Sequence, residues 1–175
     1  ICGPPSNLGM SWTPLQPGEG VEVTFSGSAV GDEPLTYTWD FGDGAVGAAL
    51  WREVFPDEPA HNVPEEVIGR KLGVQRELFF VAVDGGEIVG TAMAGYDGHR
   101  GWVYTVAVKP THRRRGVGAA LMERVEEALA AMGCPKINLQ VRVSNHGVVA
   151  FYERLGYAVE DRVSMGKKLD EGEGD

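Results

Sequence analysis

Residues 103–118 read VYTVAVKPTHRRRGVG, and this stretch decides the fold. Apolar residues up to Val108 predict a strand, while the arginines and glycines from Arg113 to Gly118 predict a turn that leads into a helix. Glycines let the backbone approach a ligand closely, and the first amides of a helix carry about half a positive charge. The stretch therefore predicts an anion site, large enough for a pyrophosphate, between a strand and a helix.

The helix that follows is the clearest element of the sequence. Gly133 and Pro135 predict its end. Its apolar residues recur at helical spacing and form one stripe, with charged residues opposite. The stripe consists of Val117, Ala120, Leu121, Val125, Ala128, Leu129 and Met132, and the charged face of Glu123, Arg124, Glu126 and Glu127.

The C-terminal third continues with alternating segments. Residues 137–143 alternate apolar and polar side chains, which predicts a half-buried strand. Ser144 or Asn145 can cap a short helix that ends at Gly156 and turns four side chains inward: Val148, Phe151, Tyr152 and Leu155. Residues 157–168 are expected to form a last strand or hairpin, and the acidic residues 170–175 a disordered tail.

On the N-terminal side, the pattern predicts two short helices and a hairpin. Residues 46–55 and a segment after Pro64 show helical spacing. Residues 78–83 and 87–96 flank the turn Asp84-Gly85-Gly86, which predicts an antiparallel hairpin. A strand over 102–108 then completes a sheet.

The first 43 residues have two interpretations. Alternating residues between 21 and 41 suggest a hairpin, and residues 37–44 resemble the signature of polycystic-kidney-disease (PKD) repeats. Such a repeat needs more chain than is present, so the segment is either a truncated PKD-like module or a chance likeness that includes the first strand of the next domain. We expect an irregular arm or partial PKD-like hairpin at 1–34, one domain at 35–169 and a tail at 170–175.

The composition restricts the class of protein. A net charge of -9, with no Lys or Arg in the first 51 residues, argues against a nucleic-acid binder. No apolar run approaches the roughly 20 residues that span a bilayer, and no signal peptide is seen, so we expect a cytoplasmic protein. The two cysteines make neither a disulfide framework nor a metal site. Three of the four histidines, His61, His112 and His146, are interpreted as surface polar residues, and no pair has metal spacing.

Two blocks of the sequence resemble the GNAT (Gcn5-related N-acetyltransferase) superfamily. Arg113, Gly116 and Gly118 match the acetyl-CoA-binding turn of that family, and residues 106–110 match the strand before it. Asn145, followed seven residues later by Tyr152 within residues 151–157, is similar to its C-terminal block, although Val148 stands where many members have Ala. The resemblance implies an α/β GNAT fold, with a mixed, mostly antiparallel sheet flanked by helices.

The resemblance also implies an activity, the transfer of an acetyl group from acetyl-CoA to a primary amine by direct attack on the thioester. Val106 and Val108 would pair with the pantetheine arm, Asn145 would hydrogen-bond that arm, and Tyr152 would protonate the leaving thiolate. The implied cofactor-binding set is Val106, Ala107, Val108, Arg113, Arg114, Arg115, Gly116, Val117, Gly118, Ala119, Asn145 and Tyr152.

Several questions stay open at this stage. The acceptor is a small-molecule or peptide amine, and a homodimer is compatible with the sequence. The general base is not identified, because Tyr104 and Thr105 stand where members of the family often have Glu; His99, Asp97, Glu66 or a water chain are candidates. The rival interpretations are a non-catalytic acyl-CoA-binding module and a surface module that uses the PKD-like segment.

Overall fold

The computed structural model describes residues 44–56 and 63–167. Its chain divides into two compact units, residues 1–139 and 140–175, and each is considered by itself. The PKD-like stretch, the hairpin expected between residues 21 and 41 and the acidic tail lie outside the described residues, apart from Gly44 at the start of the first helix.

A four-stranded sheet forms the centre of the first unit. Its strand order is β1-β2-β3-β4. The first three strands pair antiparallel, and β4 pairs parallel with β3. The prediction of a mixed, mostly antiparallel sheet with helices is therefore confirmed. The strands are β1 (Phe79–Asp84), β2 (Glu87–Tyr96), β3 (Gly101–Val108) and β4 (Ile137–Leu139).

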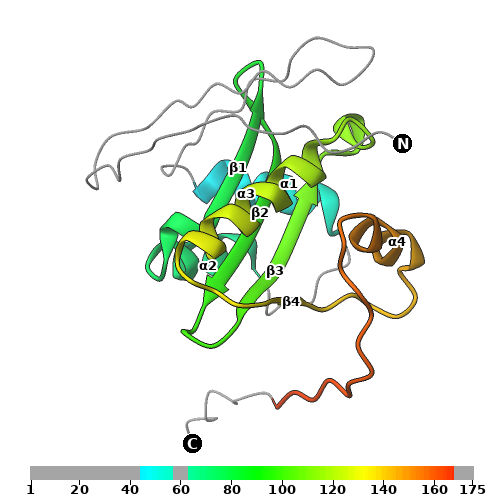
Figure 1. Cartoon of the computed structure of the whole chain (residues 1–175). Coiled ribbons are helices and arrows are strands. Elements are labelled where there is room, and N and C mark those ends of the chain that lie inside the picture. Colours follow the sequence, from blue (N-terminus) through cyan, green and yellow to red (C-terminus); the bar gives the residue numbers. More distant parts are fainter. Residues whose placement is uncertain (1–43, 57–62, 168–175) are drawn as a thin grey trace, which may run out of the picture. The chain divides into compact units, whose positions relative to one another are not determined.

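Helices cover both faces of this sheet (Figure 1). The helices α1 (Gly44–Val54) and α2 (Pro64–Leu72) pack on one face, and α3 (Val117–Ala131) packs on the other. Successive side chains of a strand point to opposite faces of the sheet, so two neighbouring residues of β2 show which helix covers which face. Gly90 faces α3, whereas Thr91 faces Trp51 of α1.

The core on the α1 side contains one buried polar contact. The indole Nε1 of Trp51 donates a hydrogen bond of 2.8 Å to Oγ1 of Thr91, and both residues are buried. This contact satisfies the only polar atom of the indole. The apolar neighbours that surround it are Ala48, Leu50, Ile68, Phe79, Val81, Met93 and Ala107.

Two glycines allow α3 to lie close to the sheet. A Cβ atom on Gly90 would come within 2.9 Å of Cγ1 of Val117 and 3.0 Å of Cδ1 of Leu121. A Cβ atom on Gly101 would come within 2.9 Å of Cδ1 of Leu129. Because Gly90 and Gly101 have no side chains, α3 can pack directly on the strands near both of its ends.

The described residues of the second unit, 140–167, contain one helix, α4 (His146–Arg154), and residues 157–167 have no regular secondary structure. The side-chain oxygen of Asn145 accepts a hydrogen bond of 3.4 Å from the amide of Val148, so the predicted cap is present. Glu153 and Arg154 are exposed, and the amide of Gly156 bonds to the carbonyl of Glu153, which ends the helix as predicted.

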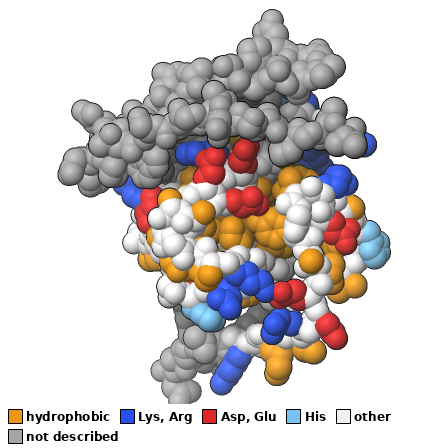
Figure 2. Space-filling view, viewed as in Figure 1, with side chains coloured by type: hydrophobic (Ala, Val, Ile, Leu, Met, Phe, Trp, Pro, Cys, Tyr) orange, Lys and Arg blue, Asp and Glu red, His pale blue; other side chains and the backbone are white. Residues whose placement is uncertain are grey.

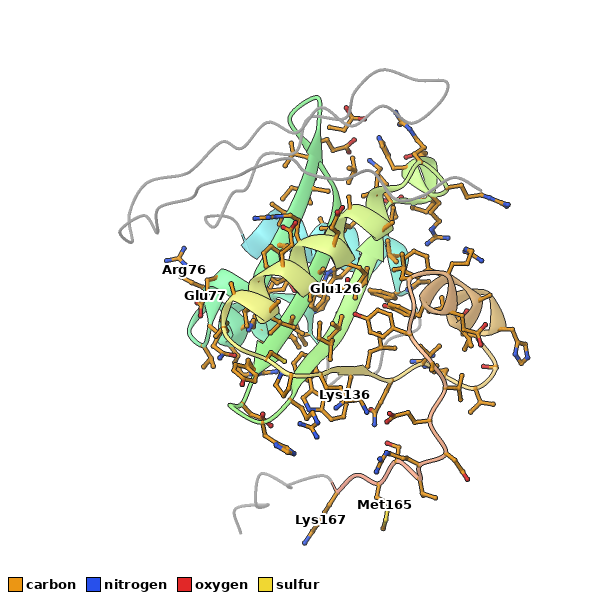
Figure 3. All side chains as sticks on the ribbon, viewed as in Figure 1. Arg76, Glu77, Glu126, Lys136, Met165 and Lys167 are labelled. Carbon is orange, nitrogen blue, oxygen red and sulfur yellow. The ribbon has the colours of Figure 1, made fainter. Side chains whose placement is uncertain are left out.

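In this part of the chain, one predicted strand is shorter than expected and another does not form. The strand expected over 137–143 ends at Leu139, and Val143 is 88% exposed. No strand forms between residues 157 and 167, where Val159, Val163 and Met165 are exposed. Met165 and Lys167 project from this segment (Figure 3). Alternation makes a strand only where a neighbouring strand pairs with it, and here the described residues provide none.

The described helices also bear on membrane insertion. None of those in residues 44–56 and 63–167 combines the length and the apolar character that a bilayer-spanning segment requires.

The approach of α3 to the sheet gives a test of this packing. We expect Gly90→Ala to lower the free energy of unfolding by about 1–3 kcal/mol, because the new methyl group overlaps Val117 and Leu121. Gly69→Ala in α2 is the matched control, since nothing lies within 4 Å of its added Cβ and Ala is the better helix former. Urea denaturation measures both. Equal stability of the Gly90 variant and the parent would contradict the packing described here.

Candidate active site

The parallel ladder between β3 and β4 stops halfway along β3. It pairs Gly101 to Val103 with Ile137 to Leu139, while β3 continues to Val108. Within residues 44–56 and 63–167, no strand pairs with β3 beyond Val103 on this side. The second half of β3 therefore has an open edge.

The register of β2 and β3 shows which backbone groups face the open edge. The amide of Lys109 donates to the carbonyl of Val89 at 2.8 Å, and Gly90 stands opposite Val108. In an antiparallel ladder this arrangement directs the N–H and C=O of Val108 away from β2. Because the direction alternates along a strand, the N–H and C=O of Val106 also face the open edge. Those of Ala107 bond to β2.

A tight turn connects the end of β3 with α3. The short 3-10 helix η2 (Pro110–His112) comes first, and the four residues of the turn follow. Arg114 has a φ of 63° and Gly116 a φ of 87°, both in the left-handed region. Arg113, Arg114, Arg115 and Gly116 are exposed, whereas Val117 is buried and anchors the turn to the sheet.

The N-terminus of α3 has free amide groups. The first helical hydrogen bond runs from the amide of Ala120 to the carbonyl of Gly116 at 3.0 Å. The three preceding amides, on Val117, Gly118 and Ala119, meet no acceptor among the described residues, and Gly116 gives no side-chain cap. The first turn of the helix has no acidic residue. These amides are available to an anion, with the helix dipole directed at it.

Cationic side chains surround this helix end, and Lys and Arg side chains are visible in Figure 2 on the side where Figure 1 shows the turn. Nε of Arg113 donates to the carbonyl of Val108 at 3.2 Å, which ties the turn to the end of β3. NH1 of Arg115 lies 3.7 Å from Oδ2 of Asp84. Arg114 makes no ion pair with the described residues.

Sequence reasoning missed the contacts that the β1–β2 hairpin makes with this region. Nε2 of His112 lies 3.1 Å from Oδ2 of Asp84, and its side chain is only 14% exposed, so His112 is not the surface residue that we expected. Lys109 pairs with Glu87, which stands opposite Asp84 at the same turn of the hairpin. No local pattern indicates these pairs, because they depend on the folding of the hairpin against the turn. The cationic charges and the glycines were the only local signals.

Asn145 and Tyr152 belong to the second unit, and the turn residues to the first. Tyr152 is buried, and its ring contacts those of Phe151 and Tyr157 edge to face, with centroids 5.0 and 5.6 Å away. Burial raises the pKa of the Tyr152 phenol to about 12. The phenol thus stays protonated at neutral pH. Asn145 is exposed and caps α4.

The candidate bases occupy different environments. The carboxylate of Asp97 accepts hydrogen bonds from the amides of Arg100 (2.7 Å) and His99 (2.8 Å), and these bonds lower its pKa. A lowered pKa makes Asp97 a weaker base and fits a turn-forming role. Glu66 pairs with Arg70 on the surface of α2. Tyr104 is 61% exposed, at a bulge where the β2–β3 register shifts.

A group of metal ligands is a further arrangement that an active site can contain. In residues 44–56 and 63–167, no group of three or more His, Cys, Asp or Glu side chains is placed to hold a metal ion.

The pKa of Tyr152 predicts a pH dependence of stability. Its folded pKa of about 12 lies above the unfolded value of about 10. The native state therefore retains this proton longer than the unfolded chain, and the resulting stability is complete below pH 10 and lost as the pH rises toward 12. We expect a loss of roughly 2–3 kcal/mol across this window. Urea denaturation at several pH values should show a smaller loss of unfolding free energy for Tyr152→Phe than for the parent. An equal dependence on pH in the two proteins would refute the raised pKa of Tyr152.

Comparison with known proteins adds to this geometry. An acetyltransferase from Yersinia pestis (strain Pestoides F) is 49% identical over 108 residues, which are 62% of this chain and 77% of the relative. Ard1 from Thermoplasma volcanium has a similar structure, with a TM-score of 0.60 and 21% identity over 70% of this chain and 83% of that one. The structure of the aminoglycoside N-acetyltransferase AAC(6′)-Iy in complex with CoA gives a TM-score of 0.55 and 23% identity, and the match covers 70% of this chain and 86% of that one.

The comparisons differ in what they show. The two structural likenesses, at under 25% identity, show the fold alone. The Yersinia relative shows the family as well, since the chain covers more than two thirds of it at nearly half identity. The acetyltransferase (GNAT) family model matches residues 38–157, well over half of the chain. The protein is an acetyltransferase and belongs to the GNAT family.

Proposed function

We propose that this acetyltransferase transfers the acetyl group of acetyl-CoA to a primary amine, by direct attack of the amine on the thioester. The observation that carries the proposal is the free N-terminus of α3, framed by exposed arginines and adjoining the open edge of β3. A diphosphate and an amide-containing arm, joined in one ligand, fit these two features. CoA has both, and members of the GNAT family use acetyl-CoA.

The turn would hold the diphosphate. The amides from Arg115 to Ala119 supply donors at the helix end, and Arg113 and Arg114 add positive charge. Hydrogen bonds from charged donors to phosphate oxygens are roughly twice as strong as neutral ones. The rest of the protein is acidic, with a net charge of -9, so this cationic turn is a local exception that favours an anionic ligand.

The open edge of β3 would hold the pantetheine arm. The N–H and C=O groups of Val106 and the N–H of Val108 face this edge, and a pantetheine amide can pair with them as a short strand would, while the carbonyl of Val108 accepts from Arg113. Negative charge develops on the thioester oxygen during attack. An amide near Val106 directed at that oxygen would stabilise the charge and lower the barrier.

Two protons must move during the reaction. The attacking amine forms a C–N bond as the C–S bond breaks, the nitrogen loses a proton to a base or to water, and the thiolate gains one. Tyr152 is the donor that we assign to the thiolate, because its phenol stays protonated at working pH. The phenol is a weaker acid than a thiol, whose pKa is near 8.5, so the proton would pass as the C–S bond breaks and negative charge builds on the sulfur. The phenolate left behind would then regain a proton from solvent. Asn145 would hydrogen-bond the pantetheine arm.

Binding of CoA should depend on charge. We expect CoA to raise the melting temperature, and the increase to shrink between 50 and 500 mM salt, because exposed cations are screened. Arg114→Gln should reduce the shift further, since Arg114 has no ion-pair partner among the described residues to be disturbed. Arg70→Gln, which removes an exposed charge from α2, is the matched control and should bind CoA like the parent. If the increase in melting temperature did not depend on salt, the turn would not be the binding site for CoA.

Turnover should depend on the Tyr152 hydroxyl. In a thiol-release assay with acetyl-CoA and a panel of primary amines, we expect Tyr152→Phe to lower kcat by about 10²-fold. Its affinity for CoA should stay within about twofold of the parent, since the phenol acts on the leaving sulfur and binding relies on the turn. Tyr157→Phe removes a hydroxyl from the neighbouring ring and is the control, with kcat unchanged. Full activity of Tyr152→Phe would exclude Tyr152 as the donor.

A further inference from the structure

One acidic residue lies beside the cationic turn. Oδ2 of Asp84, the last residue of β1, is 3.1 Å from Nε2 of His112 and 3.7 Å from NH1 of Arg115. A carboxylate at this place opposes the binding of an anion by its charge alone. Its presence therefore suggests a role that does not depend on attraction of the ligand.

The histidine that Asp84 contacts is held on both sides of its ring. Nδ1 of His112 lies 2.9 Å from Oγ1 of Thr111, and Nε2 faces Asp84. The ring is half-buried, unlike the exposed arginines that follow it. Two contacts on opposite nitrogens fix the plane of the ring, so the carboxylate restrains the position of His112.

His112 in turn connects to the start of the turn. It is the last residue of η2; its amide bonds to the carbonyl of Lys109 at 2.8 Å, and the amide of Arg113 bonds to the carbonyl of Pro110 at 3.3 Å. The direction of Arg113 is thus set by a one-turn helix whose end is restrained by the β1–β2 hairpin. A helix of one turn has little stability of its own and needs such a restraint.

The other charged groups around this contact are accounted for. Lys109 pairs with Glu87, Arg113 bonds to the carbonyl of Val108, and Arg114 has no ion-pair partner in the described part of the chain. Asp84 is therefore the acid that faces both His112 and Arg115.

We propose that Asp84 is a positioning residue for the coenzyme-binding turn, and that it acts through His112. By holding the His112 ring, the carboxylate keeps η2 and Arg113 in the orientation that presents the turn amides to a diphosphate. The inference rests on the proposed function. It gives the Asp84–His112 pair a role that requires no direct contact with the ligand.

The direction in which the affinity for CoA changes separates this positioning role from a simple effect of charge. CoA binding is measured by isothermal titration calorimetry on the full chain. We expect Asp84→Asn to weaken CoA binding about tenfold, the size of effect that outer-shell partners commonly have. A pure charge effect predicts the opposite, tighter binding. Glu87→Gln removes the same charge from the residue directly opposite Asp84, at the same turn of the hairpin; Glu87 pairs with Lys109 and not with His112, so this variant should bind CoA at least as tightly as the parent.

A double-mutant cycle tests whether the effect passes through His112. We expect His112→Ala to weaken binding as much as Asp84→Asn, and the double variant to be no weaker than either single variant. His112→Gln, whose amide can still donate to Asp84, should recover part of the affinity. Melting temperatures without CoA identify any variant that fails to fold. The variants that do fold then test whether Asp84 acts through His112.

The outcomes separate the two proposals. If the parent binds CoA and a folded Asp84→Asn variant binds it equally or more tightly, this inference is wrong and the proposed function stands. Additive losses in the double variant would also refute action through His112. If the parent itself shows no binding of CoA, the proposed function fails, and the positioning role fails with it.

Discussion

The close approach of α3 to β2 at Gly90 is the contact on which the rest of the site depends. Val117 and Leu121 occupy the space that a side chain at Gly90 would fill, so the first turn of the helix lies directly on the sheet. Because Val117 is the first residue of α3, this contact fixes where the free amides lie. The helix end, the turn before it and the end of β3 are thereby held as one structure, since packed interiors permit little adjustment.

Two kinds of unpaired backbone group result from this arrangement. In the described part of the chain, one kind is the row of amides at the start of α3, and the other is the outward-facing groups of β3 beyond Val103, apart from the Val108 carbonyl that accepts from Arg113. Backbone groups without protein partners must bind water or a ligand, because leaving them unsatisfied in a dry site is costly. The fold thus offers donors and acceptors in a fixed geometry to a ligand.

The sequence predicts the elements well where the pattern is local. The hairpin of β1 and β2, the strand β3 and the helix α3 follow from alternation or helical spacing, and Gly116 correctly marks the turn, whereas Gly118 lies inside the first turn of α3. The failures have a common cause. Residues 140–143 and 157–167 alternate in the same way, yet no neighbouring strand pairs with them among the described residues. The Asp84–His112 contact was missed because residues 28 positions apart meet only through the folded hairpin.

The conformation of Arg114 links the stability of the fold to its chemistry. A non-glycine residue at φ 63° costs roughly 1–2 kcal/mol, a strain that Asn tolerates better than Arg. A sequence shaped by folding alone would place Asn there and remove a positive charge from the helix end. Thermostabilising redesign of the protein should therefore leave residue 114 unchanged, since Asn would relieve the backbone strain but remove a positive charge from the site proposed for the diphosphate.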